Sequence, residues 1–153
     1  MEENERNLLK ALRENSRTSL LALAKQLGMP ASTVHQKVQR YHGNIIQKHT
    51  TLLDFGKLGY TRALFAIKAK PNGRDRLQTY LASRWGMNNL HKINSGYDFL
   101  AEFVGTDLKV IEDFEAALKL LPDVAGVQRF NIIEDISRET FMVGGIKWEN
   151  TEL

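Results

Sequence analysis

The stretch LLALAKQLGMPASTVHQKVQRY, residues 20–41, decides the fold of the first part of this chain. On both sides of its middle, apolar residues recur every three or four positions, as they do along the buried face of a helix. The middle favours a break, because Gly28 can take the left-handed conformation that ends a helix and Pro30 suits the first turn of the next. The pattern predicts a helix-turn-helix, which offers its second helix, the recognition helix, to a DNA major groove.

The charges of the surrounding segment support this interpretation. From Asn15 to Leu53 there is no Asp or Glu, and the basic residues give the segment a formal charge of +5. The whole chain has 21 basic and 18 acidic residues, so the remainder is slightly acidic. A positive face on the recognition helix is what a phosphate-binding surface needs. We therefore expect double-stranded DNA as a partner, rather than a solvated charge run, which would usually mix signs.

Polar residues at the start and on the exposed face of the recognition helix are the candidates for DNA contact. Gln and Arg side chains can make paired hydrogen bonds to adenine and guanine edges, and short hydroxyls suit phosphates or bases. For each residue the alternative is ordinary solvation of a surface helix. The candidates for base contact are Ser32, Thr33, His35, Gln36, Gln39 and Arg40. The candidates for phosphate contact are Arg17, Lys25, Lys37 and Lys48.

A helix before this stretch and a stop signal after it complete a first domain, residues 1–44. The first helix is expected to begin near Asn4, whose side chain can cap it. The β-branched segment 45–53 could form a wing, a linker strand or both, within a connection over residues 45–59. The expected core residues of this domain are Leu8, Leu12, Leu23, Leu27, Val34 and Val38.

A second domain is predicted over residues 60–136, where the period of the apolar residues changes from helical to alternating. Its expected elements are, in order, a strand at 63–69, a helix around 77–81, strands at 89–93 and 97–104, a helix from a cap at Thr106 or Asp107 to Leu121, and a strand at 127–136. The order β-α-β-β-α-β is that of the ferredoxin-like fold. The predicted class is therefore α+β, with an N-terminal winged helix-turn-helix and a C-terminal ferredoxin-like domain.

Helices cover only one face of such a sheet, which leaves the other face in need of a partner. That face would carry the apolar residues Leu64, Ala66, Leu100 and Val104. Pairing with an identical sheet would bury them, so we expect a homodimer. The tail, residues 137–153, could add a strand or arm to a partner through Phe141, Met142 and Val143.

Several classes of protein and site are not expected. No apolar run approaches the ~20 residues that span a bilayer, and the start is acidic rather than signal-like, so we expect no membrane partner and a cytoplasmic protein. The chain has no cysteine. Three histidines recur every seven residues, at His35, His42 and His49, but ~10 Å separates such positions on a helix, so no metal is expected. No phosphate loop, dinucleotide fingerprint or nucleophile elbow occurs, so neither an enzyme nor a cofactor is expected.

From about Glu5 to Glu139 the chain resembles the Lrp/AsnC family, the leucine-responsive or feast/famine regulators of bacteria and archaea. The resemblance rests on ERNLLKAL at 5–12, NSR at 15–17, LAKQLGM at 23–29, STV at 32–34, NSGYDF at 94–99 and LLPDV at 120–124. It implies a transcriptional regulator with a winged helix-turn-helix joined by a strand to a regulatory domain of the RAM or ACT-like type. That domain binds amino acids, forms dimers and often assembles to octamers.

The resemblance also implies an effector site at Ser95, Gly96, Tyr97 and Asp98. The family has two residues between the glycine and the acid of this loop, whereas this chain has one. Because adjacent strand residues point to opposite faces, we expect Asp98 to be out of register with the family's acid, and amino-acid specificity to be altered or absent. A tight hairpin with Gly96 at positive φ is the competing structural role.

An alternative function follows from analogy alone. Siroheme decarboxylases of the tetrapyrrole pathway resemble this two-domain build. Only His91, Arg129 and Arg138 could hold the propionate groups of such a macrocycle here.

Overall fold

A computed structural model describes residues 2–143 of the chain. It divides into two compact units, each described by itself. The helical unit contains the residues up to Leu52 and those from Ile136, and the sheet unit contains Leu53–Asp135. Residues 144–153, the end of the expected tail, lie outside the described part. None of the described helices has both the length and the apolar character that crossing a bilayer requires.

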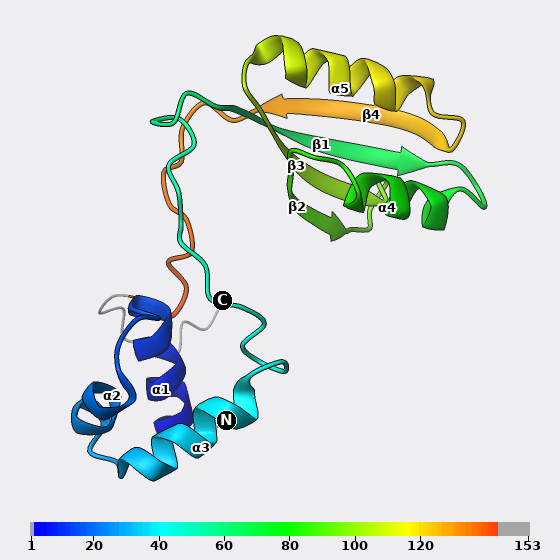
Figure 1. Cartoon of the computed structure of the whole chain (residues 1–153). Helices are drawn as coiled ribbons and strands as arrows, with labels where there is room; N and C mark the ends of the chain where they lie inside the picture. Colours follow the sequence, from blue (N-terminus) through cyan, green and yellow to red (C-terminus); the bar gives the residue numbers. More distant parts are fainter. Residues whose placement is uncertain (1, 144–153) are drawn as a thin grey trace, which may run out of the picture. The chain divides into compact units, whose positions relative to one another are not determined.

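Three helices form the helical unit, as the sequence predicted (Figure 1). They are α1 (Glu3–Glu14), α2 (Leu20–Leu27) and α3 (Ala31–Tyr41). Their apolar faces meet in one core, in which Leu8, Leu23 and Val34 are fully buried. Leu12 and Val38 are also buried, whereas Leu27 is only partly covered. Burial of apolar surface stabilises a fold by about 25 cal/mol per Å². The burial of these side chains therefore holds α3 in place.

The turn between α2 and α3 has the expected glycine geometry. Gly28 takes the left-handed conformation with φ 62°, which a residue with a side chain adopts only with strain. The Ser19 hydroxyl caps the start of α2 by accepting a hydrogen bond from the Ala22 N–H at 3.2 Å. Two caps differ from expectation: Pro30 precedes the first residue of α3, and α1 begins one residue before Asn4.

The segment 45–53 contains no strand, contrary to one of its expected roles. It makes one isolated bridge, between His42 and Ile46. Its composition favours extended backbone, but a strand also needs a neighbour for its N–H and C=O groups. Residues 141–143 likewise form no strand. Arg13 of α1 donates a hydrogen bond to the Phe141 carbonyl at 2.7 Å and pairs with Glu139.

The sheet unit has the predicted order of elements, β1 (Thr61–Ala69), α4 (Arg74–Ala82), β2 (Met87–Lys92), β3 (Phe99–Gly105), α5 (Leu108–Leu120) and β4 (Val124–Asn131). The strands form one antiparallel sheet in the order β2-β3-β1-β4 (Figure 1). β4 ends five residues before the expected Ile136, because Ala63 is the β1 partner of Asn131 and β1 begins only two residues earlier. Asp107 caps α5, as expected, by accepting from the Val110 N–H at 3.0 Å.

Both helices of this unit cover the same face of the sheet. Leu77 and Leu81 of α4 and Ile111 and Leu118 of α5 are buried against it. The strand residues of that face are Ala63, Phe65, Ile67, Phe99, Ala101 and Phe103. The Phe114 ring of α5 stacks on Phe103 with 3.9 Å between ring centres. This core orders the strands and hence the hairpin that joins β2 to β3.

Neither helix of the sheet unit, α4 or α5, covers the opposite face of the sheet. Its four expected apolar residues are there: Ala66 is 6% exposed, Val104 is 9% exposed, and Leu64 and Leu100 are half-buried. β4 adds Phe130, directly opposite Leu64 and 48% exposed. Leu64, Leu100 and Phe130 leave part of this apolar strip open to solvent, which favours an interaction surface.

Gly86, in the turn before β2, offers a stability test. Its φ is +90°, and an added Cβ would lie 2.7 Å from the Val104 carbonyl oxygen. We expect Gly86→Ala to lower the free energy of unfolding by about 3 kcal/mol, from backbone strain and overpacking. Gly59→Ala is the control, because Gly59 has φ +81° but nothing within 4 Å. Equal urea midpoints for the two variants would show that the close approach is unimportant.

Candidate nucleic-acid interface and effector site

α3 presents a row of polar side chains on the side that faces away from its core. Val34, Val38 and Tyr41 are buried and fix the helix in the unit. With 3.6 residues per turn, the positions about half a turn away from them point outward. The exposed polar residues there are Ser32, His35, Gln36 and Gln39. Thr33 is half-buried and lies at the edge of this outward row.

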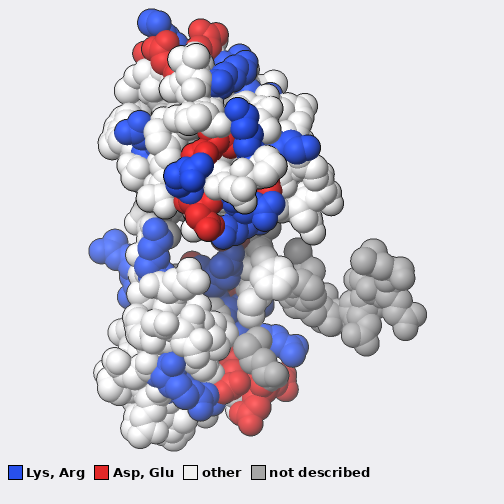
Figure 2. Space-filling model, turned by 90° about the vertical axis from the view of Figure 1, so that its right-hand side faces the viewer, with Lys and Arg blue, Asp and Glu red and all other residues white. Residues whose placement is uncertain are grey.

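Two cationic candidates lie on another side of α3, where they contact α1. Arg40 Nη2 donates to Glu5 Oε1 at 2.6 Å, and Lys37 Nζ lies 3.5 Å from the same oxygen. Arg40 also lies against Tyr41, its guanidinium carbon 5.3 Å from the ring centre. The segment 15–53 contains no acidic residue, but in the folded unit the carboxylate of Glu5 lies beside it. On the face drawn in Figure 2, acidic and basic side chains lie next to each other in both units.

Glu5 is the residue of this region whose contact with α3 the sequence did not indicate. Hydrogen bonding with the Tyr41 side chain, with the charges of Lys37 and Arg40, holds the pKa of Glu5 below its ordinary range. Glu5 therefore stays ionised at neutral pH. A carboxyl whose pKa is lowered on folding stabilises the fold above its unfolded pKa and loses that contribution as the pH falls through the folded pKa.

The other cationic candidates are exposed. Arg17 lies between α1 and α2, Lys25 lies on α2, and Lys48 lies in the irregular segment after α3. Within residues 2–143, no ion pair joins any of the three to an acidic side chain. Their positive charges are therefore open to an anionic partner such as a phosphate backbone.

The three histidines that recur every seven residues do not lie on one helix. His35 lies on α3, but His42 follows it and the chain then turns, so that the rings of His42 and His49 meet edge to face with centres 5.3 Å apart. The ~10 Å spacing of a helix does not apply to this pair, because the break at Gly43 lies between the two residues. No group of three or more potential metal-binding side chains occurs among residues 2–143.

The hairpin between β2 and β3 holds the four predicted effector residues. Ser95 and Gly96 both have positive φ, 67° and 103°. Tyr97 donates a hydrogen bond to the Gln128 side chain of β4 at 2.9 Å. Asp98 accepts from the Ala69 N–H at 2.7 Å and also pairs with Arg74. Gly96 thus has the positive φ that the structural role needs, and Asp98 ties the hairpin to β1 and α4.

A cavity of about 750 Å³ opens beside this hairpin. Residues 68–72, Arg74 and residues 93–98 line it. The volume suits a small molecule, since ligand pockets commonly measure about 300 to 1,000 Å³. All four predicted effector residues belong to its wall.

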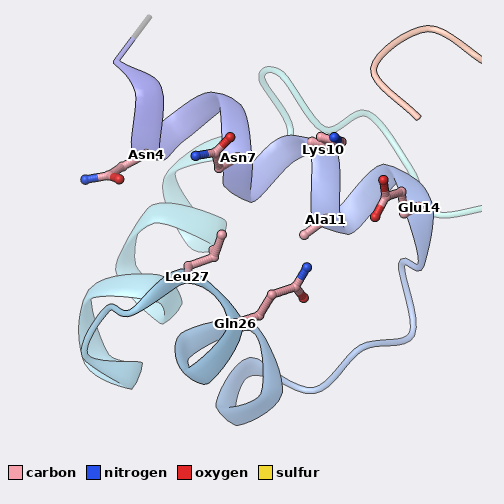
Figure 3. Close-up of a pocket in the computed structure, with 7 residues that line it drawn as sticks. All are labelled: Asn4, Asn7, Lys10, Ala11, Glu14, Gln26 and Leu27. Carbon is pink, nitrogen blue, oxygen red and sulfur yellow. The ribbon is translucent and has the colours of Figure 1, made fainter. Parts of the chain in front are cut away.

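The helical unit has a smaller groove of about 310 Å³ between α1 and α2 (Figure 3). Asn4, Asn7, Lys10 and Glu14 lie along its α1 side, and Gln26 extends toward them from α2. None of the predicted DNA contacts lines this groove. It has mixed polar groups and no convergent charge, so we assign no ligand to it.

Comparison with known proteins decides the family. Residues 2–42 match the AsnC-type helix-turn-helix domain. An uncharacterised HTH-type transcriptional regulator of Pyrococcus horikoshii is 30% identical over 101 residues, which are 63% of this chain and 67% of that one. The chain belongs to the Lrp/AsnC family of transcriptional regulators. The resemblance of the sequence is therefore confirmed.

Solved structures show that the Lrp/AsnC fold extends over both units. AsnC of E. coli has a TM-score of 0.79 at 18% identity, over 90% of this chain and 95% of that one. A transcriptional regulator from Neisseria meningitidis, solved in complex with L-Met, has a TM-score of 0.81 at 15% identity, over 90% of this chain and 93% of that one. The α+β fold with an N-terminal helix-turn-helix is confirmed.

Neither the comparisons nor the structure supports the decarboxylase alternative. The relatives are named as transcriptional regulators. Arg129 pairs with Glu115 at 3.1 Å, and His91 is exposed on β2. Arg138 belongs to the helical unit rather than the sheet unit. The three basic residues therefore do not come together within one unit of this Lrp/AsnC chain.

Proposed function

We propose that this regulator recognises specific DNA sequences through the outward row of α3. The observation that carries the proposal is the row itself, Ser32, His35, Gln36 and Gln39, exposed on a helix whose other side is buried. Glutamine can pair with the N6 and N7 groups of adenine, and hydroxyls can bond to bases or phosphates. Such contacts discriminate between bases because each base pair shows a distinct pattern in the major groove.

The remaining candidates receive roles from their positions. Arg17, Lys25 and Lys48 are assigned to phosphates, which set affinity and register without reading sequence. Lys37 and Arg40 are assigned to the edge of the interface, because Glu5 already holds both. Thr33, half-buried beside the row, is assigned a phosphate contact at the start of α3.

Binding to genomic fragments of the source organism tests the proposal. The full chain should retard a minority of fragments in the presence of excess random DNA, and raised salt should weaken every complex. Equal retardation of all fragments would leave only non-specific binding, and no retardation at low salt would refute a DNA-binding role.

Removal of Glu5 should change non-specific binding in a defined direction. Glu5→Gln frees Lys37 and Arg40 from their shared carboxylate, so we expect severalfold tighter binding to random duplex. The slope of log affinity against log salt should steepen by about 1, the value for one further phosphate contact. Glu112→Gln removes the same charge from an exposed position on α5 and is the control. Fluorescence anisotropy at several salt concentrations measures both; identical slopes would contradict the role assigned to Glu5.

We also propose that the chain forms a homodimer through the uncovered face of the sheet. Such dimers could assemble further, for example into an octamer. The support is the apolar strip formed by Leu64, Ala66, Leu100, Val104 and Phe130. A two-fold dimer would present two recognition helices to two half-sites of DNA.

The cavity beside the β2–β3 hairpin is our proposed effector site. Its support is the volume of about 750 Å³ and the presence of Ser95, Gly96, Tyr97 and Asp98 in its wall. The Neisseria meningitidis regulator, which has the same fold, was solved with L-Met. A small molecule in this cavity would bias DNA binding only if it favoured one of two states of the protein.

A further inference from the structure

The cavity beside the hairpin has an excess of positive charge. Three cationic side chains line it, Lys68, Lys70 and Arg74, against one carboxylate, Asp98. Lys68 and Lys70 are exposed, and 63% of the Arg74 side chain is exposed. Cations at the wall of an open pocket raise the local concentration of anions. The charge therefore favours a negatively charged ligand.

The one carboxylate is already engaged by its own chain. Its Oδ2 accepts a hydrogen bond from the Ala69 N–H at 2.7 Å, and its Oδ1 pairs with Arg74 Nη2. Only 12% of the Asp98 side chain is exposed. The Ala69 bond, followed by the charges of Arg74 and Lys68, holds the pKa of Asp98 below its ordinary range. Asp98 thus neutralises an internal partner rather than offering a free carboxylate to an incoming ammonium.

Backbone donors add to the same preference. No described residue accepts a hydrogen bond from the N–H groups of residues 94–97. α4 begins at Arg74, beside the cavity, and Gly73 before it supplies no side-chain cap. The first N–H groups of a helix and its dipole favour a negative charge. The backbone of residues 94–97 therefore lines the same cavity as the three cations, whereas the start of α4 already has the Asp123 carboxylate beside Gly73.

We propose that this cavity takes a small organic dianion that has no ammonium group, such as a dicarboxylate or a phosphate monoester. This rests on the proposed effector site and specifies its ligand. Lys68 and Lys70 contact the negative groups, and Arg74, which pairs with Asp98, lines the same cavity. An amino acid would place its ammonium among three cations with no free carboxylate to pair with it, and an unpaired charge is costly to desolvate.

Calorimetric titration of the full chain with matched probes tests this. Glutarate and L-glutamate share two carboxylates and differ only in the ammonium, so glutarate should bind at least tenfold more tightly. Glycerol 3-phosphate tests the phosphate class, and L-methionine tests a plain amino acid. Binding of either dianion should weaken with salt, because exposed charges are screened. Binding to random duplex in the same preparation reports separately on the DNA-binding function.

Two variants give changes of opposite sign. Lys70→Gln should weaken dianion binding about fivefold, the size of one screened charge contact. Asp98→Asn keeps an oxygen for the Ala69 N–H but removes the negative charge, so it should tighten dianion binding severalfold. Lys109→Gln removes a positive charge from exposed α5, outside the cavity, and should change nothing. Thermal melting checks that each variant remains folded.

The outcomes separate cleanly. Preference for a dianion, tightened by Asp98→Asn, supports the proposal. Preference for L-glutamate or L-methionine, lost in Asp98→Asn, overturns it while leaving the effector site in place. Absence of any binding at millimolar concentration, in protein that still binds DNA, overturns both the ligand class and the effector site without touching the DNA-binding function.

Discussion

Replacement of Arg62 by alanine is expected to lower the free energy of unfolding of the sheet unit by about 3 to 5 kcal/mol. Arg62 is 8% exposed and lies on the face of the sheet opposite the helices. Its Nη1 donates to Glu102 at 3.1 Å and its Nη2 donates to Asp135 at 2.5 Å. Burial opposes its charge, but the bonds to Asp135 and Glu102 prevail and raise the pKa of Arg62 further. Alanine would leave the buried Glu102 carboxylate without its cation.

Urea unfolding, monitored through hydrogen exchange of the β1 and β3 amides, measures this loss of stability in the sheet unit. The control is the double variant Arg62→Met with Glu102→Gln, which removes both charges and keeps a side-chain oxygen for the Asn88 and Asn89 amides that donate to Glu102. Replacing both partners of a buried pair is often neutral or stabilising. Similar losses in the single and double variants would show that the pair itself, rather than the stranded carboxylate, supplies the stability.

The double variant Gln36→Ala with Gln39→Ala is expected to lose about 2 to 6 kcal/mol at the preferred DNA site, since each paired contact to a base contributes about 1 to 3 kcal/mol. Both side chains are exposed on α3. Binding to random duplex should hardly change, because the cations that meet phosphates remain. The expected result is therefore a smaller ratio of specific to non-specific affinity.

Gln26→Ala is the matched control for this experiment. Gln26 is an exposed glutamine of α2 that faces the groove next to α1, away from the outward row of α3. Competition binding with a specific and a random duplex, at one salt concentration, gives both affinities. If Gln36→Ala with Gln39→Ala left the ratio of specific to non-specific affinity unchanged, these two residues would not contact the bases.

Local signals explain how much of the fold could be predicted from the sequence. The glycine at position 28 marks the end of α2, because only glycine adopts the left-handed backbone conformation without strain. The change from helical to alternating apolar period marks the start of the sheet unit, and each element after it was found, although β4 ends five residues earlier than expected. These features depend on neighbours in sequence, so periodicity and turn residues are sufficient to detect them.

Contacts between distant residues explain what could not be predicted. Glu5 lies far in sequence from Lys37 and Arg40, so the paired state of those two cations shows only in the fold. The same holds for Arg62 and Glu102, which sit diagonally across β1 and β3. Charged residues within apolar strands were the available signal for that pair, and their partners depended on strand register. The β-branched segment 45–53 was misleading because composition does not supply a pairing partner.

Selection from a library of random duplexes at physiological salt tests sequence-specific recognition by α3 most directly. We expect the wild-type chain to enrich a motif with two related half-sites about one helical turn apart, or a multiple of it, as a two-fold dimer requires. The Gln36→Ala with Gln39→Ala variant should lose that motif while still retaining DNA. Recovery of unenriched sequences by the wild-type chain, or of the same motif by both proteins, would contradict recognition through this row.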